Sequence, residues 1–142
     1  MIKSLEDFKA YNKAMDVGEK IWDVAAKWSF FEKDTVGKQL VRAVDSIAAN
    51  LSEGLGRYHF KEIKNFSYYS RGSLFETKTW VTKAFNRNLI DKDIFKRLIS
   101  ELEEIGKMIN GYINSLGDRS NGVNEPEEEY IRTQYQSPDN ES

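Results

Sequence analysis

The clearest chemical pattern in this sequence is a set of basic and aromatic residues that recur every three or four positions. Basic side chains bind phosphates and aromatic rings stack on unpaired bases, so this spacing along one helical face predicts a nucleic-acid-binding surface. The predicted site consists of Arg57, Lys61, Lys64, Tyr68, Arg71, Phe75 and Lys78. A solvated basic face is the alternative, because such faces are common on helices and the isoelectric point of 5.6 is not strongly basic.

A second row of polar residues lies just upstream and also advances by three or four positions. Its members are Gln39, Arg42, Ser46, Asn50, Glu53 and Arg57. A structural role is favoured over ligand binding, because Glu53 and Arg57 have the spacing of an ion pair within one helix and Asn50 could satisfy a helix end.

Catalytic and cofactor chemistry finds little support in this chain. There is no cysteine, and the single histidine, His59, has Gly56 three positions before it, so the Glu-x-x-His motif of di-metal bundles is absent. The Gly54-Leu55-Gly56 segment lacks the third glycine of a dinucleotide fingerprint. Carboxylates at Glu53, Glu62 and Glu76 have no diagnostic metal spacing. We therefore expect a non-enzymatic protein without catalytic residues, cofactor or metal, and a turn position for His59.

Four long helices are predicted to position these residues. No proline occurs before Pro126, and strict period-two alternation is absent. One helix follows Ser4 as N-cap, a second starts after Asp34-Thr35 and ends at the glycines 54–56, and a third covers residues 60–88. The fourth runs from Asp91 to Gly117, with apolar residues at alternating spacings of three and four. We expect an all-α, antiparallel up-down-up-down four-helix bundle over residues 1–117.

Length, charge and composition limit the class of protein. The chain has 142 residues, 39% of them hydrophobic, which suits one domain with one core. Residues 1–117 contain 19 Lys and Arg against 16 Asp and Glu, whereas residues 118–142 contain 2 against 7. No apolar run approaches membrane length and no secretory signal is evident, so the cytoplasm is the expected compartment and no membrane is an expected partner.

The segment 118–142 is predicted to be a disordered acidic tail. It holds both prolines and little apolar area to offset the entropy cost of ordering. Its one cluster able to anchor is Tyr130-Ile131 with Tyr135, which could dock on a partner or on the body, although a solvated tail is favoured.

Self-association is predicted from the first helix, which carries two apolar stripes where an isolated bundle needs one. Phe8, Tyr11, Met15 and Trp22 form one stripe, beside Ala14, Val17, Ile21, Ala25 and Trp28. Some of this area is expected to face another subunit, and a wide stripe against a thick core is the alternative.

Beyond these patterns, the residues resemble a known family. Residues 39–57, QLVRAVDSIAANLSEGLGR, are similar to a hallmark of the four-helix-bundle proteins encoded in intervening sequences of bacterial 23S rRNA genes. Lys61-Glu62-Ile63 and residues 72–76 resemble the third-helix motif, and the similarity covers residues 4–117. The chain departs from the family at Ser29 and Ala48, where proline is frequent, and at His59, where serine is frequent.

The resemblance implies a ring, a homopentamer of antiparallel four-helix bundles. It extends to the accessory variability proteins of diversity-generating retroelements, which bind nucleic acid and a reverse transcriptase. RNA or DNA is therefore an expected partner, and a reverse transcriptase is one if the gene lies in a retroelement. No catalytic residue carries over. The resulting hypothesis is a ribosomal-RNA-associated scaffold or accessory factor, and the alternative is a structural or protein-interaction oligomer that does not bind nucleic acid.

Overall fold

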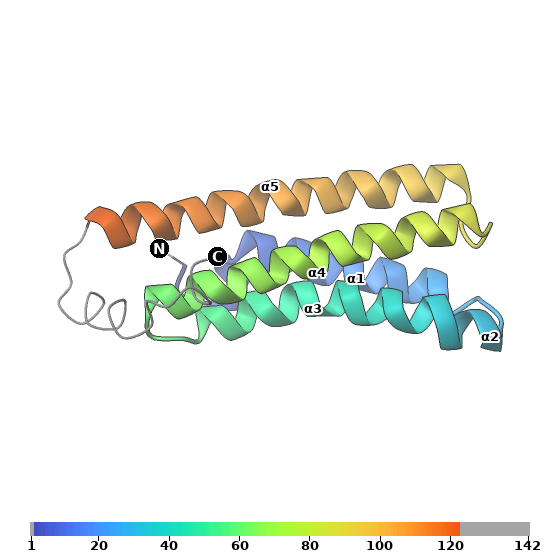
Figure 1. The fold of residues 1–142 in the computed structure, drawn as a ribbon, viewed down its shortest axis with the longest axis horizontal. Coiled ribbons are helices and arrows are strands. Elements are labelled where there is room, and N and C mark those ends of the chain that lie inside the picture. Colours follow the sequence, from blue (N-terminus) through green and yellow to red (C-terminus); the bar gives the residue numbers. More distant parts are fainter. Residues whose placement is uncertain (1, 123–142) are drawn as a thin grey trace, which may run out of the picture.

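Four long helices form the body of the protein and pack antiparallel (Figure 1). The computed structural model describes residues 2–122, with side chains for residues 2–117. The long helices are α1 (Lys9–Ala25), α3 (Lys38–Leu55), α4 (Phe60–Asn86) and α5 (Lys92–Gly122), and the short segments are η1 (Leu5–Asp7), α2 (Phe30–Glu32) and η2 (Lys33–Gly37). The prediction of an all-α antiparallel four-helix bundle is confirmed. Residues 123–142 of the predicted tail lie outside the described residues.

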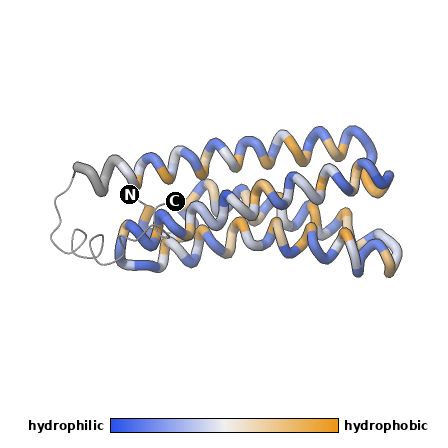
Figure 2. The backbone as a smooth tube through the Cα atoms, in the orientation of Figure 1, coloured by the Kyte–Doolittle hydropathy of each residue, from blue (hydrophilic) through white to orange (hydrophobic). Residues whose placement is uncertain are grey.

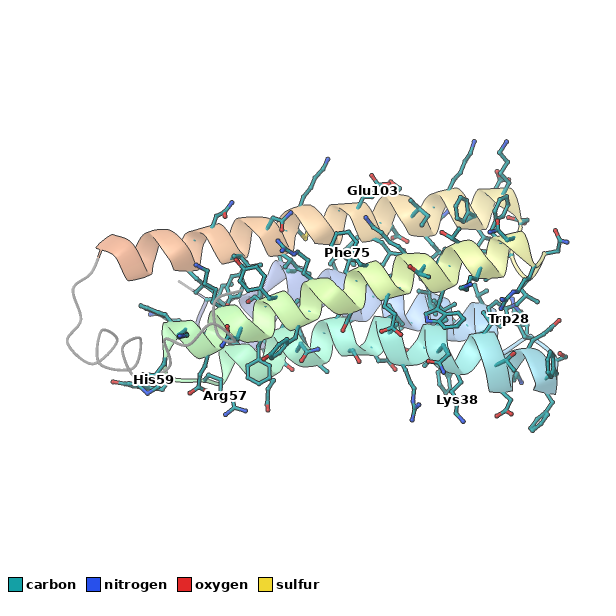
Figure 3. The ribbon with its side chains drawn as sticks, in the orientation of Figure 1. Trp28, Lys38, Arg57, His59, Phe75 and Glu103 are labelled. Carbon is teal, nitrogen blue, oxygen red and sulfur yellow. The ribbon has the colours of Figure 1, made fainter. Side chains whose placement is uncertain are left out.

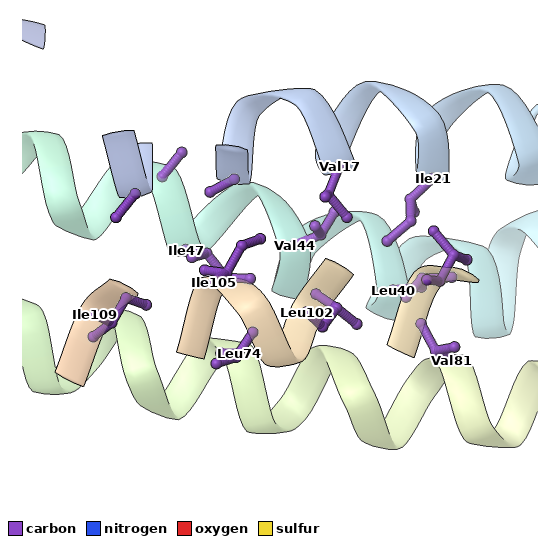
Figure 4. Packing of buried hydrophobic residues seen from close by; sticks show 14 of the residues in the cluster. Val17, Ile21, Leu40, Val44, Ile47, Leu74, Val81, Leu102, Ile105 and Ile109 are labelled. Carbon is purple, nitrogen blue, oxygen red and sulfur yellow. The ribbon is translucent and has the colours of Figure 1, made fainter. Parts of the chain in front are cut away.

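All four long helices contribute to one apolar core. Apolar and polar residues alternate turn by turn along each helix (Figure 2), as expected for elements with one buried side. The fully buried side chains meet between the helices (Figure 4), and they include Val17 and Ile21 of α1, Leu40, Val44 and Ile47 of α3, Leu74 and Val81 of α4, and Leu102, Ile105 and Ile109 of α5. The second predicted stripe of the first helix therefore faces the core.

The first helix begins later than the sequence predicts. Ser4 precedes the short 3-10 segment η1, its side chain makes no capping bond to the backbone, and α1 starts after Phe8. Phe8 adopts an extended conformation, with φ of −91° and ψ of 93°. Its ring is 1% exposed and lies 4.6 Å from the ring of Tyr112. Burial of this ring explains why the chain is not helical at residue 8.

The helical run that contains α3 begins earlier than predicted, at Phe30 rather than after Asp34-Thr35. Ser29 Oγ accepts a hydrogen bond from the Glu32 backbone N–H at 3.2 Å, and Glu32 Oε1 accepts one from the Ser29 N–H at 2.9 Å. This reciprocal arrangement is a capping box, which fixes a helix start. The π-helical segment η2 then joins α2 to α3.

Helices α3 and α4 make the most extensive contact in the bundle. Gly54 is buried there, and a Cβ on it would lie 2.8 Å from the Cβ of Phe66. One turn further along α4, Ser70 Oγ donates a 2.7 Å hydrogen bond across the interface to the Ile47 carbonyl. The predicted end of this helix at glycines 54–56 is confirmed, since α3 ends at Leu55 and Gly56 is its C-cap. Neither glycine adopts the left-handed conformation that often ends a helix, because no glycine in the described part of the chain has positive φ. Gly54 instead permits close packing.

The turn between α4 and α5 places Asn88 at a φ of 60°. Asp91 Oδ1 then accepts a hydrogen bond from the Ile94 N–H at 2.8 Å, which confirms Asp91 as the cap of the last helix. The predicted end at Gly117 is wrong, because α5 continues to Gly122 and Gly117 has no left-handed φ. None of the helices within residues 2–122 has the length and apolarity needed to cross a bilayer.

Candidate nucleic-acid interface

Six of the seven predicted site residues lie along one side of α4. At about 100° per residue, Lys64, Arg71 and Lys78 share one row, and Lys61, Tyr68 and Phe75 form a parallel row beside it. We call these six residues the α4 flank. Arg71 Nη1 donates a 3.1 Å hydrogen bond to Asn110 Oδ1 of α5, so the cationic row faces that helix. Figure 3 shows Phe75 on the side of α4 that faces α5.

Two cations of the flank lie over its aromatic rings. The guanidinium carbon of Arg71 is 4.9 Å from the ring centre of Tyr68, and Lys78 Nζ is 5.5 Å from that of Phe75. Such contacts hold each cation at a defined place on the surface. The two rings differ in exposure, since Tyr68 packs partly against the core while Phe75 is 59% exposed. Phe75 is therefore the ring that an incoming base can reach.

The cationic row carries charge that no carboxylate of residues 2–117 neutralises at short range. Among residues 2–117, no carboxylate oxygen lies within 4.0 Å of the charged nitrogens of Lys64, Arg71 or Lys78. Lys64 Nζ instead reaches toward the backbone of α5, 3.4 Å from where a Cβ on Gly117 would stand. An unneutralised row of cations attracts phosphate groups.

Arg57 is the one predicted residue that lies apart. It follows the end of α3, and its guanidinium is 3.0 Å from Glu53 Oε1 and 3.6 Å from Glu62 Oε2. The group also lies 4.9 Å from the ring centre of Phe66, on the side of α4 that packs against α3. The structure thus separates Arg57 from the α4 flank and pairs it with two carboxylates.

Members of the upstream polar row contact one another in pairs. Glu53 and Arg57 form the predicted ion pair. Asn50 Nδ2 donates a 2.9 Å hydrogen bond to the Ser46 carbonyl inside α3, so it does not satisfy a helix end. His59 occupies the N-cap of α4 without a side-chain capping bond, and its ring meets Tyr58 edge-on at 4.9 Å. No group of three or more metal-ligating side chains occurs in the part of the chain that the structure describes.

A groove between α1 and α3 is a second surface feature, and the sequence did not predict it. It has a volume of about 370 Å³ and an apolar lining that includes Trp22, Ala26 and Val41, with Lys38 and Arg42 at its edge. Trp22 is 58% exposed, and Phe30 and Phe31 of α2 are 83% and 74% exposed. Trp22 belongs to the apolar stripe predicted for self-association, but the groove depends on how two helices are placed, which periodicity does not reveal.

Two acidic groups have altered titration. Burial, together with the charge of Glu19, raises the pKa of Asp45. Burial alone would raise the pKa of Glu101, but hydrogen bonds from Lys20 and Lys13 more than offset it and lower that pKa below its ordinary value. Lys20 Nζ lies 2.6 Å from Glu101 Oε1 and Lys13 Nζ lies 3.2 Å from the same oxygen. This cluster ties α1 to α5 on the side of the bundle away from the groove.

Comparison with known proteins decides the family. The sequence profile of the 23S rRNA-intervening sequence proteins matches residues 6–111, most of the helical body. The chain belongs to this family. The 23S rRNA-intervening sequence fold is also similar to the crystal structure of a protein of unknown function from the S23 ribosomal protein family of Bacteroides thetaiotaomicron. That similarity has a TM-score of 0.66 at 18% identity and covers 73% of this chain and 97% of the other, so it shows the fold alone. No curated protein matches the chain.

Proposed function

We propose that this 23S rRNA-intervening sequence protein is a non-enzymatic, nucleic-acid-associated scaffold or accessory factor that binds through the α4 flank. The observation that carries the proposal is the row of Lys64, Arg71 and Lys78, which has no carboxylate within 4.0 Å among residues 2–117. Phosphate contacts supply most of the affinity in sequence-independent binding.

The dimensions of the row suit a nucleic-acid backbone. Residues seven apart on a helix lie about 10.5 Å apart along its axis, so the three cations extend over roughly 21 Å. The exposed ring of Phe75 lies in the adjacent row, and stacking on such a ring requires an unpaired base. We therefore favour single-stranded or looped RNA over a continuous duplex.

Self-association completes the proposed arrangement. Trp22 lines the groove between α1 and α3, and Phe30 and Phe31 of α2 are also exposed. Burial of exposed aromatic side chains favours assembly. The family resemblance suggests a pentamer. In a ring, each subunit would present one α4 flank, and weak contacts would add through multivalency.

The alternative function is a structural or protein-interaction oligomer that does not bind nucleic acid. The same exposed aromatic surface favours it, as does the net charge of −2 of the whole chain. The two functions differ in one measurable property, since phosphate binding releases counterions and weakens steeply with salt.

Fluorescence anisotropy with labelled RNA over a salt series tests the proposal. The full chain, freed of copurified nucleic acid, is expected to bind single-stranded RNA with micromolar or tighter affinity. Replacing Lys64, Arg71 and Lys78 with Glu should remove three phosphate contacts. The slope of log affinity against log salt should then fall by about 2, because each contact to a single strand contributes about 0.7.

A matched control changes the same net charge elsewhere. Lys9→Glu, Lys27→Glu and Lys96→Glu alter three exposed lysines outside the α4 flank. This variant should keep the salt slope of the original chain. If both variants weaken binding equally, net charge rather than the flank governs affinity. If the unaltered chain fails to bind RNA at low salt, the structural oligomer becomes the better function.

A further inference from the structure

A hollow lies at the end of the bundle where α3 ends, α4 begins and α5 approaches its C-terminal end. Its volume is about 540 Å³. Leu55, Ile63, Tyr112 and Leu116 give it an apolar floor, and Arg57 and Phe60 contribute to its wall. Figure 3 places Arg57 and His59 at this end, opposite the end that holds Trp28 and Lys38. The volume falls in the range of sites that hold bulky apolar groups.

The charges around the hollow have both signs, because Asp7 and Arg57 both line it. The N-terminal end of α4 opens onto it, and a helix N-terminus carries partial positive charge. Lys64 lies beside it, since its Nζ reaches Gly117, the residue after Leu116 of the floor. Arg57 is already shared by Glu53 and Glu62, so Lys64 and the helix end are the positive groups that remain for an acidic ligand. The hollow therefore suits an apolar group, and Lys64 is the cation that a carboxylate next to that group can reach.

One segment of this chain has that chemistry. Beyond Gly122, the sequence reads Glu125-Pro126-Glu127-Glu128-Glu129-Tyr130-Ile131. Four carboxylates precede the adjacent pair Tyr130-Ile131, so an apolar anchor follows directly after a run of negative charge. The segment thus combines an apolar pair for the floor of the hollow with carboxylates for Lys64.

Chain length allows this segment to reach the hollow of its own body. Leu116 lies six residues before the end of α5, which is about 9 Å along the helix. Tyr130 lies eight residues beyond Gly122 and can extend to at most about 29 Å. The return from Gly122 to the hollow is thus well within reach.

The same reach excludes the apolar groove between α1 and α3. Lys20 of α1 contacts Glu101 of α5, so these two residues lie at the same level of the bundle. Glu101 is 21 residues before Gly122, or roughly 32 Å along α5, and Trp22 lies further still. That distance exceeds the reach of Tyr130 in the same chain.

We propose that residues 125–131 dock in cis on the hollow formed by α3, α4 and α5, with Tyr130 and Ile131 on the apolar floor and the glutamates beside Lys64. The short connection gives a high effective concentration, so docking requires only weak intrinsic affinity. Docking brings carboxylates to the end of the α4 flank. Any resulting competition with RNA depends on the proposed function, whereas docking itself does not.

Disulfide trapping tests the proposal in the full chain, which contains no cysteine of its own. Ser115 is exposed and lines the hollow, and Arg132 follows the anchor. The doubly substituted chain Ser115→Cys/Arg132→Cys, placed in a glutathione redox buffer at submicromolar concentration, should form an intramolecular disulfide. Its rate should be at least about tenfold higher than in a control with Ser115→Cys/Ser137→Cys, since the longer loop alone changes closure by only about 1.5-fold.

A second control removes the anchor and keeps both thiols. Adding Tyr130→Ser and Ile131→Ser to the Ser115→Cys/Arg132→Cys chain should lower its rate of disulfide formation to that of the Ser115→Cys/Ser137→Cys control. Equal rates of disulfide formation in all three chains would overturn the proposal, because they would mean that the two thiols meet by chance. Docking in cis would also be overturned if the Ser115→Cys/Arg132→Cys chain formed disulfide-linked dimers, in place of an intramolecular disulfide, faster than the two controls do. The assay contains no nucleic acid, so its outcome is independent of RNA binding.

Discussion

The Cβ of Phe66 in α4 lies 2.8 Å from the position that a Cβ on Gly54 of α3 would take. Two carbon atoms that are not bonded cannot approach so closely, and neither belongs to the adaptable end of a side chain. A residue with a side chain at position 54 would therefore force the backbones of α3 and α4 apart. This contact lies at the end of the bundle where the hollow is formed, and it sets the spacing of the helix pair.

Gly54→Ala is accordingly expected to destabilise the fold. Overpacking costs typically about 1–3 kcal/mol, and the higher helix propensity of alanine returns at most about 1 kcal/mol. A net loss of roughly 1–2 kcal/mol in unfolding free energy should appear in urea denaturation. Gly72→Ala is the matched control, because Gly72 is also in a helix but a Cβ there meets nothing within 4 Å. That variant should be as stable as the original chain or slightly more so.

Glu101→Gln should lower stability at neutral pH by about 1 kcal/mol or less, as expected for a partly exposed ion-pair cluster. The pKa of Glu101 is lower in the folded chain than its ordinary value. A carboxylate with a lowered folded pKa stabilises the fold above its unfolded pKa, about 4.3, and this contribution disappears as the pH falls through the folded pKa. The unfolding free energies of the two chains in urea should therefore differ at pH 7 and converge once the pH is below the folded pKa of Glu101.

A control for this prediction lies on the same helix. Glu103 is exposed, and Figure 3 shows it on α5. Glu103→Gln should leave the unfolding free energy nearly unchanged at both pH values. A pH-independent difference between the original chain and Glu101→Gln would mean that packing, rather than charge, accounts for the role of Glu101.

Ser29→Ala should remove half of the capping box at the start of α2. The Ser29 hydroxyl is the acceptor for the Glu32 N–H, and loss of an N-cap side chain costs about 1 kcal/mol. Thermal unfolding monitored by circular dichroism should show a lower Tm. Ser100→Ala, at an exposed position within α5, should show no such loss. An unchanged Tm for Ser29→Ala would mean that α2 contributes little to cooperative folding.

Most of the helical body could be predicted from the sequence, because helical periodicity depends only on residues that are close together along the chain. The apolar residues of α5 and the cap at Asp91 follow from spacing and residue type, and both are confirmed. The predicted starts of the first and second helices differ from the observed starts, near Phe8 and Ser29, for different reasons. Phe8 is set by tertiary burial against Tyr112, which no local rule contains. The Ser29-x-x-Glu32 spacing is that of a capping box and is present in the sequence, whereas the prediction rested on Asp34-Thr35 alone.

The candidate site was predictable only as far as one helix extends. The six residues of the α4 flank share one side of α4 because a continuous helix fixes the directions of their side chains. Arg57 precedes that helix, so the spacing of three or four residues no longer applies across the turn. Its partners, Glu53 and Glu62, come from two helices, and the grooves and hollows likewise depend on the placement of neighbouring helices.

Phe75→Leu should separate stacking from charge in RNA binding. Leucine keeps apolar volume but lacks the aromatic face, and stacking on an aromatic side chain contributes about 1–3 kcal/mol per base. Affinity for single-stranded RNA should fall at least about fivefold, with the salt slope unchanged, and affinity for duplex RNA should change little. Equal losses for both RNAs would show that Phe75 acts by positioning Lys78, whose Nζ lies 5.5 Å from its ring centre.

Replacing Trp22 and Phe30 with Ser should reduce the mass of the assembly measured by light scattering. The two side chains are 58% and 83% exposed, so their removal creates no cavity in the core. Burial of apolar area at about 25 cal/mol per Å² drives association. Trp22 lines the groove between α1 and α3, and Phe30 lies in α2, just before Lys33 of the same lining. Leu5→Ser, at an exposed apolar residue distant from that groove, should keep the original mass. If the double variant also keeps the original mass and its helical content, assembly uses another surface and the exposed aromatic residues serve a different partner.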